Sequence, residues 1–456
     1  MTERKKAVAA RFDSAHDYDA AARIQKRCVE ILARKIALTY AQTPPRHILE
    51  FGCGTGALTE ALSQLFPEAE IEAIDLSPHM IARAQARVPS ARFAIMDAER
   101  PQLSRSYDLI CSSLCLQWFT DRAQGLARLS RHVAPGGRMM IGTLAERSFQ
   151  EWRAACAAAR VPCQFPDYPP LSELEREWPP CGHGVWEQQA LIDQPGDSHG
   201  FLRDLKRIGA DLPKADAQRQ NSASLRRVMR RFDQGERRVT YDIAFGSFQK
   251  PRGVFVTGTD TGIGKTLVSA ILTRAWDAFY WKPLQTGLAD EAGDTPTVAH
   301  LTQAPSQKIL PPAYALQAPL APWEAAQREG VTIAPNRLAL PDVSPLVVEG
   351  AGGLMVPVTA QISMIDLIAD YGLPVVLVAR SGLGTINHTL LSLEALRTRD
   401  IAVAGVVLSG PLNPGNRAAI ETFGKVKILA EIPHLDTIDA ASVATLAADI
   451  PRLETL

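Results

Sequence analysis

Residues 254–266 constrain the fold of this chain more than any other stretch. They read Val-Phe-Val-Thr-Gly-Thr-Asp-Thr-Gly-Ile-Gly-Lys-Thr, an apolar strand that runs into a glycine-rich loop and then into a helix. The backbone amides of such a loop, together with the helix N-terminus, collect the negative charge of phosphates. In a loop of this kind, Lys265 reaches the β and γ phosphates and Thr266 binds magnesium. The stretch therefore predicts a nucleotide site in a parallel α/β fold.

A second glycine-rich loop lies early in the chain. Residues 50–56 read Glu-Phe-Gly-Cys-Gly-Thr-Gly, and they follow a strand-like run and open a helix-length segment. Glycine at these positions lets the backbone approach a nucleoside, because no Cβ intervenes. Asp75 ends the next strand, where a carboxylate accepts the ribose hydroxyl protons. The same spacing fits a dinucleotide fingerprint, so the loop alone leaves a dinucleotide and S-adenosylmethionine open.

Two later landmarks favour S-adenosylmethionine. Asp97 follows the third strand-like run, and residues 133–137, Val-Ala-Pro-Gly-Gly, precede a fifth. The arrangement resembles a class I S-adenosylmethionine-dependent methyltransferase. This resemblance implies that the cofactor is bound by Glu50, Gly52, Gly54, Gly56, Asp75 and Asp97.

The order of the strand-like runs predicts two domains. A chain of 456 residues exceeds a typical single domain, and apolar runs alternate with helix-length segments on both sides of residues 150–240. We expect an α/β protein of two doubly wound domains, a Rossmann-like methyltransferase fold with a helical cap and then a P-loop NTPase-like fold. The cap should end in an edge strand near residues 239–245. The expected boundaries are 1–247 and 252–456.

Charge and cysteine usage exclude several classes of protein. Lys plus Arg equals Asp plus Glu, 49 against 49, so no global attraction to nucleic acid or to an anionic membrane is expected. The 7 cysteines form no CxxC pair, which suits reduced thiols better than a disulfide framework or a zinc site. No segment offers the ~20 apolar residues that span a bilayer. A cytoplasmic enzyme is expected.

Three motifs in the first half carry a narrower resemblance. They are residues 11–15 (Arg-Phe-Asp-Ser-Ala) with Tyr18, residues 113–118 (Ser-Leu-Cys-Leu-Gln-Trp), and residues 201–210 (Phe-Leu-Arg-Asp-Leu-Lys-Arg-Ile-Gly-Ala). Together they resemble malonyl-acyl-carrier-protein methyltransferase over roughly residues 5–245. The resemblance implies methyl transfer from S-adenosylmethionine to the free carboxylate of a malonyl group that is carried on acyl carrier protein.

The substrate side of this half rests on three residues. Tyr18 and Trp118 are expected to line the pocket, and Arg203 to clamp the carboxylate. Core packing explains the two aromatic residues equally well, and a solvated helix face or carrier-protein docking explains Arg203. Basic residues of the cap suit an acidic carrier protein, although a solvated helix accounts for any one of them. The candidates are Arg226, Arg227, Arg230 and Arg231.

The second half resembles dethiobiotin synthetase over about residues 253–456. The phosphate loop opens with Gly-Thr-Asp-Thr, and further matches lie at residues 281–287, 348–357, 382–389 and 431–433. The resemblance implies that carbon dioxide is joined to 7,8-diaminopelargonate to form the cyclic urea of dethiobiotin, with ATP consumed. It also implies a homodimer through the C-terminal domain.

The same resemblance assigns the residues of the ligase site. Lys265 and Lys282 supply positive charge to the transferring phosphoryl group, and Thr286 hydrogen-bonds the carbamate. Thr266, Asp294 and Glu349 hold Mg²⁺, although Asp294 is also explained as one of several solvated acids in its loop. Pro433, His434 and Leu435 border the adenine. The remaining expected contacts to the nucleotide are Thr261, Gly262, Ile263, Gly264, Leu267, Gly350, Ala351 and Gly352.

Two departures and two alternatives stay open at this point. Sixteen residues separate Lys265 from Lys282, fewer than the resemblance leads us to expect, and this shortening bears on where Lys282 lies. Ser409 and Gly410 stand where an asparagine often contacts adenine. The alternatives are a small-molecule methyltransferase fused to the ligase, and a non-catalytic P-loop nucleotide switch in place of the ligase.

Overall fold

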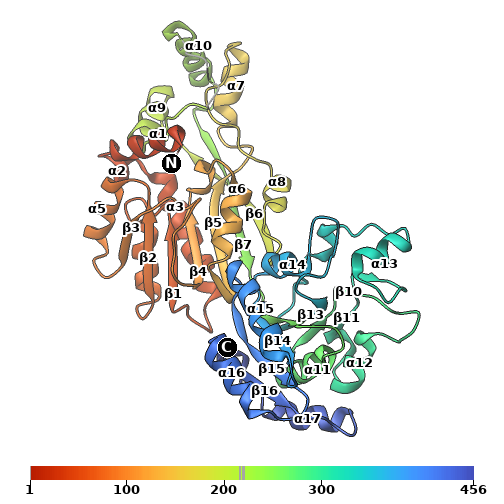
Figure 1. The fold of residues 1–456 in the computed structure, drawn as a ribbon. Coiled ribbons are helices and arrows are strands. Elements are labelled where there is room, and N and C mark those ends of the chain that lie inside the picture. The colour runs from red at the N-terminus through yellow and green to blue at the C-terminus, as the bar shows by residue number, and fades with distance from the viewer. Residues whose placement is uncertain (1, 215–216, 218–220, 456) are drawn as a thin grey trace. The chain divides into compact units, whose positions relative to one another are not determined.

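The computed structural model describes residues 2–214, 217 and 221–455, and the chain divides into two compact units (Figure 1). The first unit consists of Met1–Pro179 and Gly184–Lys250, and the second of Pro180–His183 and Pro251–Leu456. Each unit is built around its own sheet. The two doubly wound α/β folds expected from the sequence are confirmed.

The sheet of the first unit has seven strands in the order β3-β2-β1-β4-β5-β7-β6. Strands β1 to β5 are parallel, and β7 pairs with β5 in the antiparallel direction. The strands are β1 (His47–Phe51), β2 (Glu70–Asp75), β3 (Arg92–Ile95), β4 (Tyr107–Ser113), β5 (Val133–Leu144), β6 (His183–Asp193) and β7 (Val239–Gln249).

The expectation of an edge strand near residues 239–245 is wrong. Strand β7 lies between β5 and β6, and β6 forms that edge of the sheet. Nearly every residue of β7 is buried, whereas most residues of β6 are exposed or half-buried. A strand that is buried on both faces needs a neighbour on each side, and the exposed strand takes the edge.

Helices of the first unit form where the sequence gives them a buried stripe and a cap. Helix α3 buries Ile24, Cys28, Leu32 and Ile36, which recur every four residues. Helix α5 begins at Ser77, whose side chain accepts a hydrogen bond from the Met80 amide. The helices are α1 (Glu3–Asp13), α2 (Tyr18–Ala21), α3 (Arg23–Thr39), α4 (Ala57–Leu65), α5 (Pro78–Arg87), η1 (Leu116–Trp118), α6 (Arg122–Ser130), α7 (Gln150–Ala158), α8 (Leu171–Arg176), α9 (Ser198–Arg207) and α10 (Ser222–Asp233).

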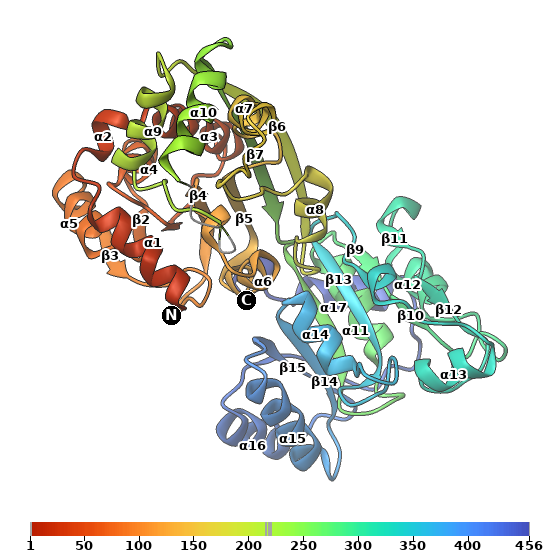
Figure 2. The same ribbon diagram turned by 90° about the horizontal axis from the view of Figure 1, so that it is seen from above.

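The predicted helical cap gathers at one end of the first unit, where α7, α9 and α10 lie together (Figures 1 and 2). Its interior is aromatic. The Trp152 ring lies 5.4 Å from the Phe201 ring and 5.5 Å from the Phe232 ring, measured between centroids. Because these rings come from three different helices, they tie α7, α9 and α10 to one another.

The main sheet of the second unit is parallel, with the order β11-β9-β13-β8-β14-β15-β16, and β10 pairs with β12 beside it. All six residues of β8 are buried, as expected for a strand in the middle of a parallel sheet. The strands are β8 (Gly253–Gly258), β9 (Phe279–Trp281), β10 (Leu284–Gln285), β11 (Ile309–Leu310), β12 (Tyr314–Ala315), β13 (Leu346–Gly353), β14 (Val375–Arg380), β15 (Val403–Ser409) and β16 (Ile428–Ile432).

The strand order of the second unit sets the geometry of its site. Since β13 lies between β8 and β9, the carboxyl ends of these three strands meet at one edge of the sheet. The helices are α11 (Lys265–Ala275), α12 (Asp294–Thr302), η2 (Ser306–Lys308), α13 (Pro322–Arg328), η3 (Pro335–Leu338), α14 (Met364–Tyr371), α15 (Thr385–Thr398), α16 (Pro414–Gly424), α17 (Ala440–Ala448) and η4 (Leu453–Thr455). Among the described residues, no helix has the length and apolar character needed to cross a membrane.

Candidate active sites

The glycine loop of the first unit follows β1. Gly52 and Gly54 have positive φ angles of 65° and 53°, and both line a pocket at the carboxyl ends of the strands. A Cβ at Gly52 would overlap the side chain of Cys115, whereas a Cβ at Gly54 would have no neighbour within 4 Å. Gly52 is therefore needed for packing, and Gly54 leaves open space on the pocket side.

Asp75 ends β2 and lines the same pocket. Its two carboxylate oxygens accept hydrogen bonds of 2.9 Å from the backbone amides of Gly54 and Ser77. Burial raises the pKa of Asp75, even though these amides favour the ionised form. The carboxylate is thus fixed in orientation where the sequence expects the ribose hydroxyls.

Asp97 is held by a residue that the sequence analysis missed. Lys5 Nζ lies 2.6 Å from Asp97 Oδ1 and 2.5 Å from Glu99 Oε2, and the lysine is 5 % exposed. Through this lysine, α1 is fastened to the segment that follows β3. The signal was weak, because a lysine in an N-terminal helix with several charged residues usually points to solvent.

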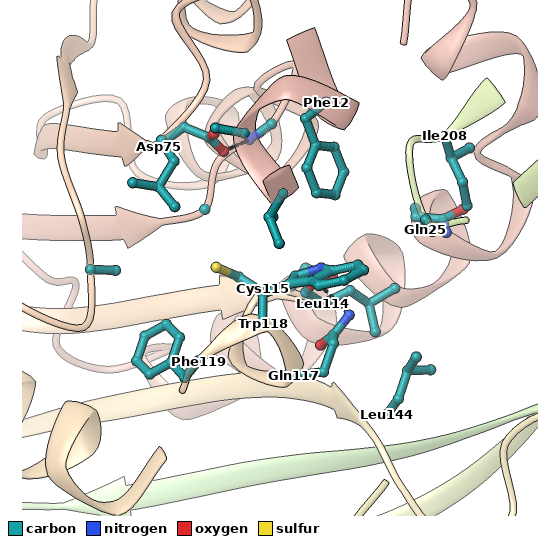
Figure 3. Close-up of a pocket in the computed structure, with 18 of the residues that line it drawn as sticks. Phe12, Gln25, Asp75, Leu114, Cys115, Gln117, Trp118, Phe119, Leu144 and Ile208 are labelled. Carbon is teal, nitrogen blue, oxygen red and sulfur yellow. Dashed lines mark hydrogen bonds between the residues drawn. The ribbon is translucent and has the colours of Figure 1, made fainter. Parts of the chain in front are cut away.

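Aromatic residues close the pocket. The ring of Phe12 lies 5.8 Å from that of Trp118 and 6.5 Å from that of Tyr18. Figure 3 shows Phe12 and Trp118 facing one another, with Cys115 beside Trp118 and Asp75 on the side away from Gln25 and Ile208. The space between the lining atoms, counted with the open mouth, is about 1090 Å³.

The structure brings most of the expected methyltransferase residues into one pocket, but three lie elsewhere. Glu50 is buried and accepts a 2.5 Å hydrogen bond from Thr59, and it is not among the residues that line the pocket. Gly56 begins α4 with a φ of 82° and is not in the lining. The Arg203 side chain is 63 % exposed on α9, and it also lies outside the lining. The residues brought together are Tyr18, Gly52, Gly54, Asp75, Asp97 and Trp118.

In the second unit the phosphate loop connects β8 to α11. Gly264 has a φ of 93° and precedes the first residue of the helix, so the loop turns sharply into α11. The ammonium of Lys265 donates a 3.0 Å hydrogen bond to the carbonyl oxygen of Asp260. Burial lowers the pKa of Lys265, and the nearby Lys282 lowers it further. Thr261, Gly262, Ile263 and Leu267 belong to the same loop and the first turn of the helix.

Three side chains with oxygen atoms converge beside this loop. Thr266 Oγ1 lies 2.5 Å from Asp294 Oδ1 and 3.1 Å from Glu349 Oε1. Thr266 is in the first turn of α11, Asp294 begins α12, and Glu349 is fully buried in β13. A hydroxyl and two carboxylates are a donor set that suits Mg²⁺, which prefers oxygen ligands and completes its shell with phosphate oxygens and water.

Lys282 joins this cluster from the end of β9. Its ammonium forms ion pairs with Asp294 Oδ2 and, at 3.0 Å, with Glu349 Oε1. Burial disfavours the charged lysine, but the two carboxylates outweigh burial and raise the pKa of Lys282 above its ordinary value. In the same pairing, burial raises the pKa of Asp294 but Lys282 outweighs it, so that this pKa is lowered. Although the segment before Lys282 is short, Lys282 lies beside Asp294 and Glu349.

Tyr280 was not predicted from the sequence. Its hydroxyl donates a 2.9 Å hydrogen bond to Glu349 Oε2, and the ring is fully buried. Tyr280 lies two residues before Lys282 in β9, so that their side chains reach the same face of the sheet. A tyrosine in an apolar strand gives no signal by itself, because core packing explains it equally well.

The remaining predicted residues lie at the same edge of the sheet. Thr286 directly follows β10, and Gly350, Ala351 and Gly352 lie in the last part of β13. Pro433, His434 and Leu435 follow the end of β16. A Cβ at Gly264 would lie 3.1 Å from Ser409 Oγ, which places the serine at the end of β15 next to the phosphate loop.

The two sites define two classes of enzyme within one chain. The first unit has the strand order, the glycine loop and the acid at the end of β2 that characterise class I methyltransferases. The second has a phosphate loop with two lysines and two acids at the carboxyl edge of a parallel sheet, as in ATP-dependent P-loop enzymes.

Comparisons with known proteins agree with this division. Residues 48–137 match the family described as a methyltransferase domain, and residues 252–442 match the family described as an AAA domain. The chain is 52% identical over 456 residues, 99% of this chain and 97% of the relative, to the biotin biosynthesis bifunctional protein BioCD of Bordetella avium. Over 196 residues, 43% of this chain and 94% of the relative, it is 56% identical to the ATP-dependent dethiobiotin synthetase BioD of Paramagnetospirillum magneticum. The solved structure of the YcgJ protein from Bacillus subtilis covers 48% of this chain with a TM-score of 0.36 and 14% identity, and 98% of that protein is covered.

The chain belongs to the family of BioCD bifunctional biotin biosynthesis proteins. It is an enzyme that combines an S-adenosylmethionine-dependent methyltransferase with an ATP-dependent dethiobiotin synthetase. Biotin synthesis of this kind implies 7,8-diaminopelargonate and carbon dioxide as substrates of the second activity. Both resemblances read from the sequence are confirmed.

Proposed function

We propose that the first unit methylates the free carboxylate of a malonyl group carried on acyl carrier protein. The observation that carries this proposal is the pocket itself. Asp75 marks its cofactor side, and Phe12, Tyr18 and Trp118 line it with aromatic surface. Methyl transfer to a carboxylate needs little acid–base help, because the nucleophile is already ionised. It needs alignment with the sulfonium methyl and exclusion of water, which such an aromatic pocket supplies.

For the second unit, we propose specific roles for the residues around the phosphate loop. One amine of the diamine takes up carbon dioxide as a carbamate, the γ-phosphoryl group of ATP passes to a carbamate oxygen, and the second amine expels phosphate as the ring closes. Lys265 and Lys282 stabilise the negative charge that develops on the phosphoryl group. Thr266, Asp294 and Glu349 hold Mg²⁺, which neutralises phosphate charge when bound. Their convergence beside Lys282 is the support for this assignment.

Contacts to the diamine and to the nucleobase complete this proposal. Thr286 donates to the carbamate, and the backbone of Gly350, Ala351 and Gly352 approaches substrate and phosphate. Pro433, His434 and Leu435 border the adenine. Each of these residues follows or ends a strand at the carboxyl edge of the sheet, where ligands of parallel α/β folds bind.

The carrier protein is proposed to dock on α10. Arg226, Arg227, Arg230 and Arg231 are all exposed on this helix, while Val228, Met229 and Phe232 are buried on the opposite side. Over residues 2–214, 217 and 221–455, none of the four arginines has an ion pair with an acid. An acidic partner therefore finds guanidinium groups that are not already neutralised.

Assembly and location are the last parts of the proposal. We propose catalytic domains of residues 1–247 and 252–456, and a homodimer formed through the second. Support for the dimer comes from exposed apolar side chains of that unit, among them Leu383, Leu391 and Phe423. A cytoplasmic location is supported by the seven cysteines, which are all free thiols.

Product assays on the full chain test both activities separately. With S-adenosylmethionine, malonyl-acyl carrier protein should gain one methyl group by mass, and Asp75→Ala should abolish this gain while dethiobiotin formation persists. With ATP, Mg²⁺, bicarbonate and the diamine, dethiobiotin should form, and Lys265→Met should abolish only this product. Equal methylation of free malonate would favour the small-molecule alternative. ATP hydrolysis that is indifferent to the diamine would favour the nucleotide switch.

A further inference from the structure

We propose that the methyl-accepting carboxylate is held by the neutral hydroxyl groups of Tyr168 and Tyr241, and not by a cation. The inference rests on the proposed function of the first unit, and it assigns Tyr168, between α7 and α8, and Tyr241, in β7, to substrate recognition. Both tyrosines line the same pocket as Asp75 and Trp118.

The two tyrosines are held by their rings and have free hydroxyl groups. The ring of Phe149 lies 4.9 Å from that of Tyr241 and 6.0 Å from that of Tyr168. Among the described residues, no hydrogen bond is formed by the hydroxyl of Tyr168 or Tyr241, although Tyr241 is only 6 % exposed. Burial raises the pKa of both phenols above their ordinary value, so both stay protonated and can donate.

Their position suits the group that accepts the methyl. The charged side chains of Asp193 and Arg23 act on Tyr241. Arg23 begins α3, the helix that also carries Gln25. In Figure 3, Gln25 lies on the side of the pocket away from Asp75. The Gln25 side chain likewise has no hydrogen-bond partner in the described part of the chain. Within the described ranges, Tyr168, Tyr241 and Gln25 are therefore unpartnered donors in the lining, and Tyr18, which interacts with Asp75, is another.

Lys5, Arg23 and Arg153 each have a carboxylate partner. Lys5 is the one basic side chain in the lining, over the described residues, and it is bound by Asp97 and Glu99. Arg23 lies 2.9 Å from Asp193 and 2.8 Å from Asp204. Arg153, which acts on Tyr168, is bound to Asp167 at 2.9 Å.

Neutral donors suit a carboxylate that must act as a nucleophile. A guanidinium would share the negative charge of the oxygen and lower its tendency to attack. Phenol hydroxyls orient the carboxylate and leave lone pairs available, while the sulfonium of the cofactor balances the charge within a pocket of low dielectric. Hydrogen bonds to an ionised group are strong, so the loss of one is expected to lower affinity by about tenfold to a hundredfold.

The test uses the full chain with malonyl-acyl carrier protein and the variants Tyr168→Phe, Tyr241→Phe and the double variant. Each single change should lower kcat/KM by about tenfold or more, and the double change should lower it further. The affinity for S-adenosylhomocysteine should stay within about twofold in each variant. Tyr40→Phe is the matched control, since its hydroxyl donates to the Asp108 carbonyl and it lies outside the pocket lining. This variant should keep full activity.

A binding measurement separates this proposal from the proposed function. Malonyl-pantetheine and its methyl ester are titrated into the chain with S-adenosylhomocysteine bound. The wild type should prefer the acid, and the two Phe variants should lose that preference without losing affinity for the ester. Variants that keep the preference, together with an Arg203→Ala variant that loses it, would overturn the proposal in favour of a cationic clamp. A wild type that shows the preference but methylates no malonyl-acyl carrier protein would refute the proposed function alone.

Discussion

The hydroxyl of Tyr280 donates a 2.9 Å hydrogen bond to Glu349 Oε2. The other carboxylate oxygen, Oε1, lies 3.1 Å from Thr266 Oγ1 and 3.0 Å from Lys282 Nζ. One residue of β9 thus fixes the rotation of a buried carboxylate in β13, because it holds the oxygen that Thr266 and Lys282 do not contact. The consequence is that Oε1 is presented to the loop before any ligand binds.

Removing this hydroxyl should weaken magnesium binding more than it weakens the fold. In Tyr280→Phe, Glu349 is free to rotate, and the Mg²⁺ concentration that gives half-maximal dethiobiotin synthesis should rise by about tenfold. The stabilisation of the second unit by Mg²⁺ and ATP in thermal unfolding should shrink in parallel. Tyr371→Phe is the control, because it removes a buried hydrogen bond to the Leu338 carbonyl that has no link to Glu349. Equal magnesium responses in the two variants would contradict the positioning role.

Lys282 should stabilise the folded second unit as a counter-ion, in addition to its proposed role at the phosphoryl group. Lys282→Met leaves Asp294 and Glu349 without their cation, and breaking such a buried pair costs about 3 kcal/mol. Urea unfolding of the second unit without Mg²⁺ should show this loss of free energy. Added Mg²⁺ should restore more stability to the variant than it adds to the wild type, because the acids are then free to bind it. If the variant is as stable as the wild type without Mg²⁺, the ion pairs contribute nothing to the free energy of unfolding.

The two pocket glycines should differ when each is replaced by alanine. Gly54→Ala meets no atom within 4 Å, so it should cost only the ~1 kcal/mol of a left-handed non-glycine residue while its methyl group obstructs the cofactor. Gly52→Ala overlaps Cys115 and should destabilise the first unit by clearly more. Thermal unfolding and calorimetric binding of S-adenosylhomocysteine would separate the two effects. The prediction that the alanine methyl group obstructs the cofactor is wrong if Gly54→Ala binds S-adenosylhomocysteine as tightly as the wild type.

Glu50 should make the first unit less stable as the pH rises. Burial raises the pKa of Glu50 to about 8, with Asp75 adding to the shift. Between the ordinary value near 4.5 and about 8, the folded state keeps a proton that the unfolded chain has released, so the free energy of unfolding falls with pH. The buried Asp75 acts in the same direction. Glu50→Gln should flatten this fall, and urea unfolding at pH 5, 6, 7 and 8 would measure it. Parallel slopes for the two proteins would contradict the assignment.

The parts of the two sites that follow strands directly could be predicted from the sequence. Asp75 ends β2, and Glu349 lies within β13 immediately before the register shift against β8, in parallel sheets whose topology leaves little freedom. Lys282 lies beside Asp294 and Glu349, although the segment before it is short, because β9 pairs with β13.

Residues from the cap and the N-terminal helix could not be predicted in the same way. Arg203 was chosen from a motif, but the sequence does not say which face of α9 turns inward, and its side chain is 63 % exposed. Tyr168 and Tyr241 are far apart in the sequence, and in the structure the rings of both contact Phe149. The sequence also does not show that β6 pairs with β7, so that the interior position of β7 in the sheet could not be predicted.

The ion pairs of Lys5 hold the N-terminal helix against the pocket of the first unit. Helix α1 supplies Lys5, Val8, Ala9 and Phe12 to the wall of the pocket, and its lysine is buried against Asp97 and Glu99. A protein that started translation after Asp13 would retain every strand of the sheet, yet its reaction chamber would stand open to water. Start-site choice and the placement of a purification tag are therefore questions of catalysis in this protein, and not only of expression.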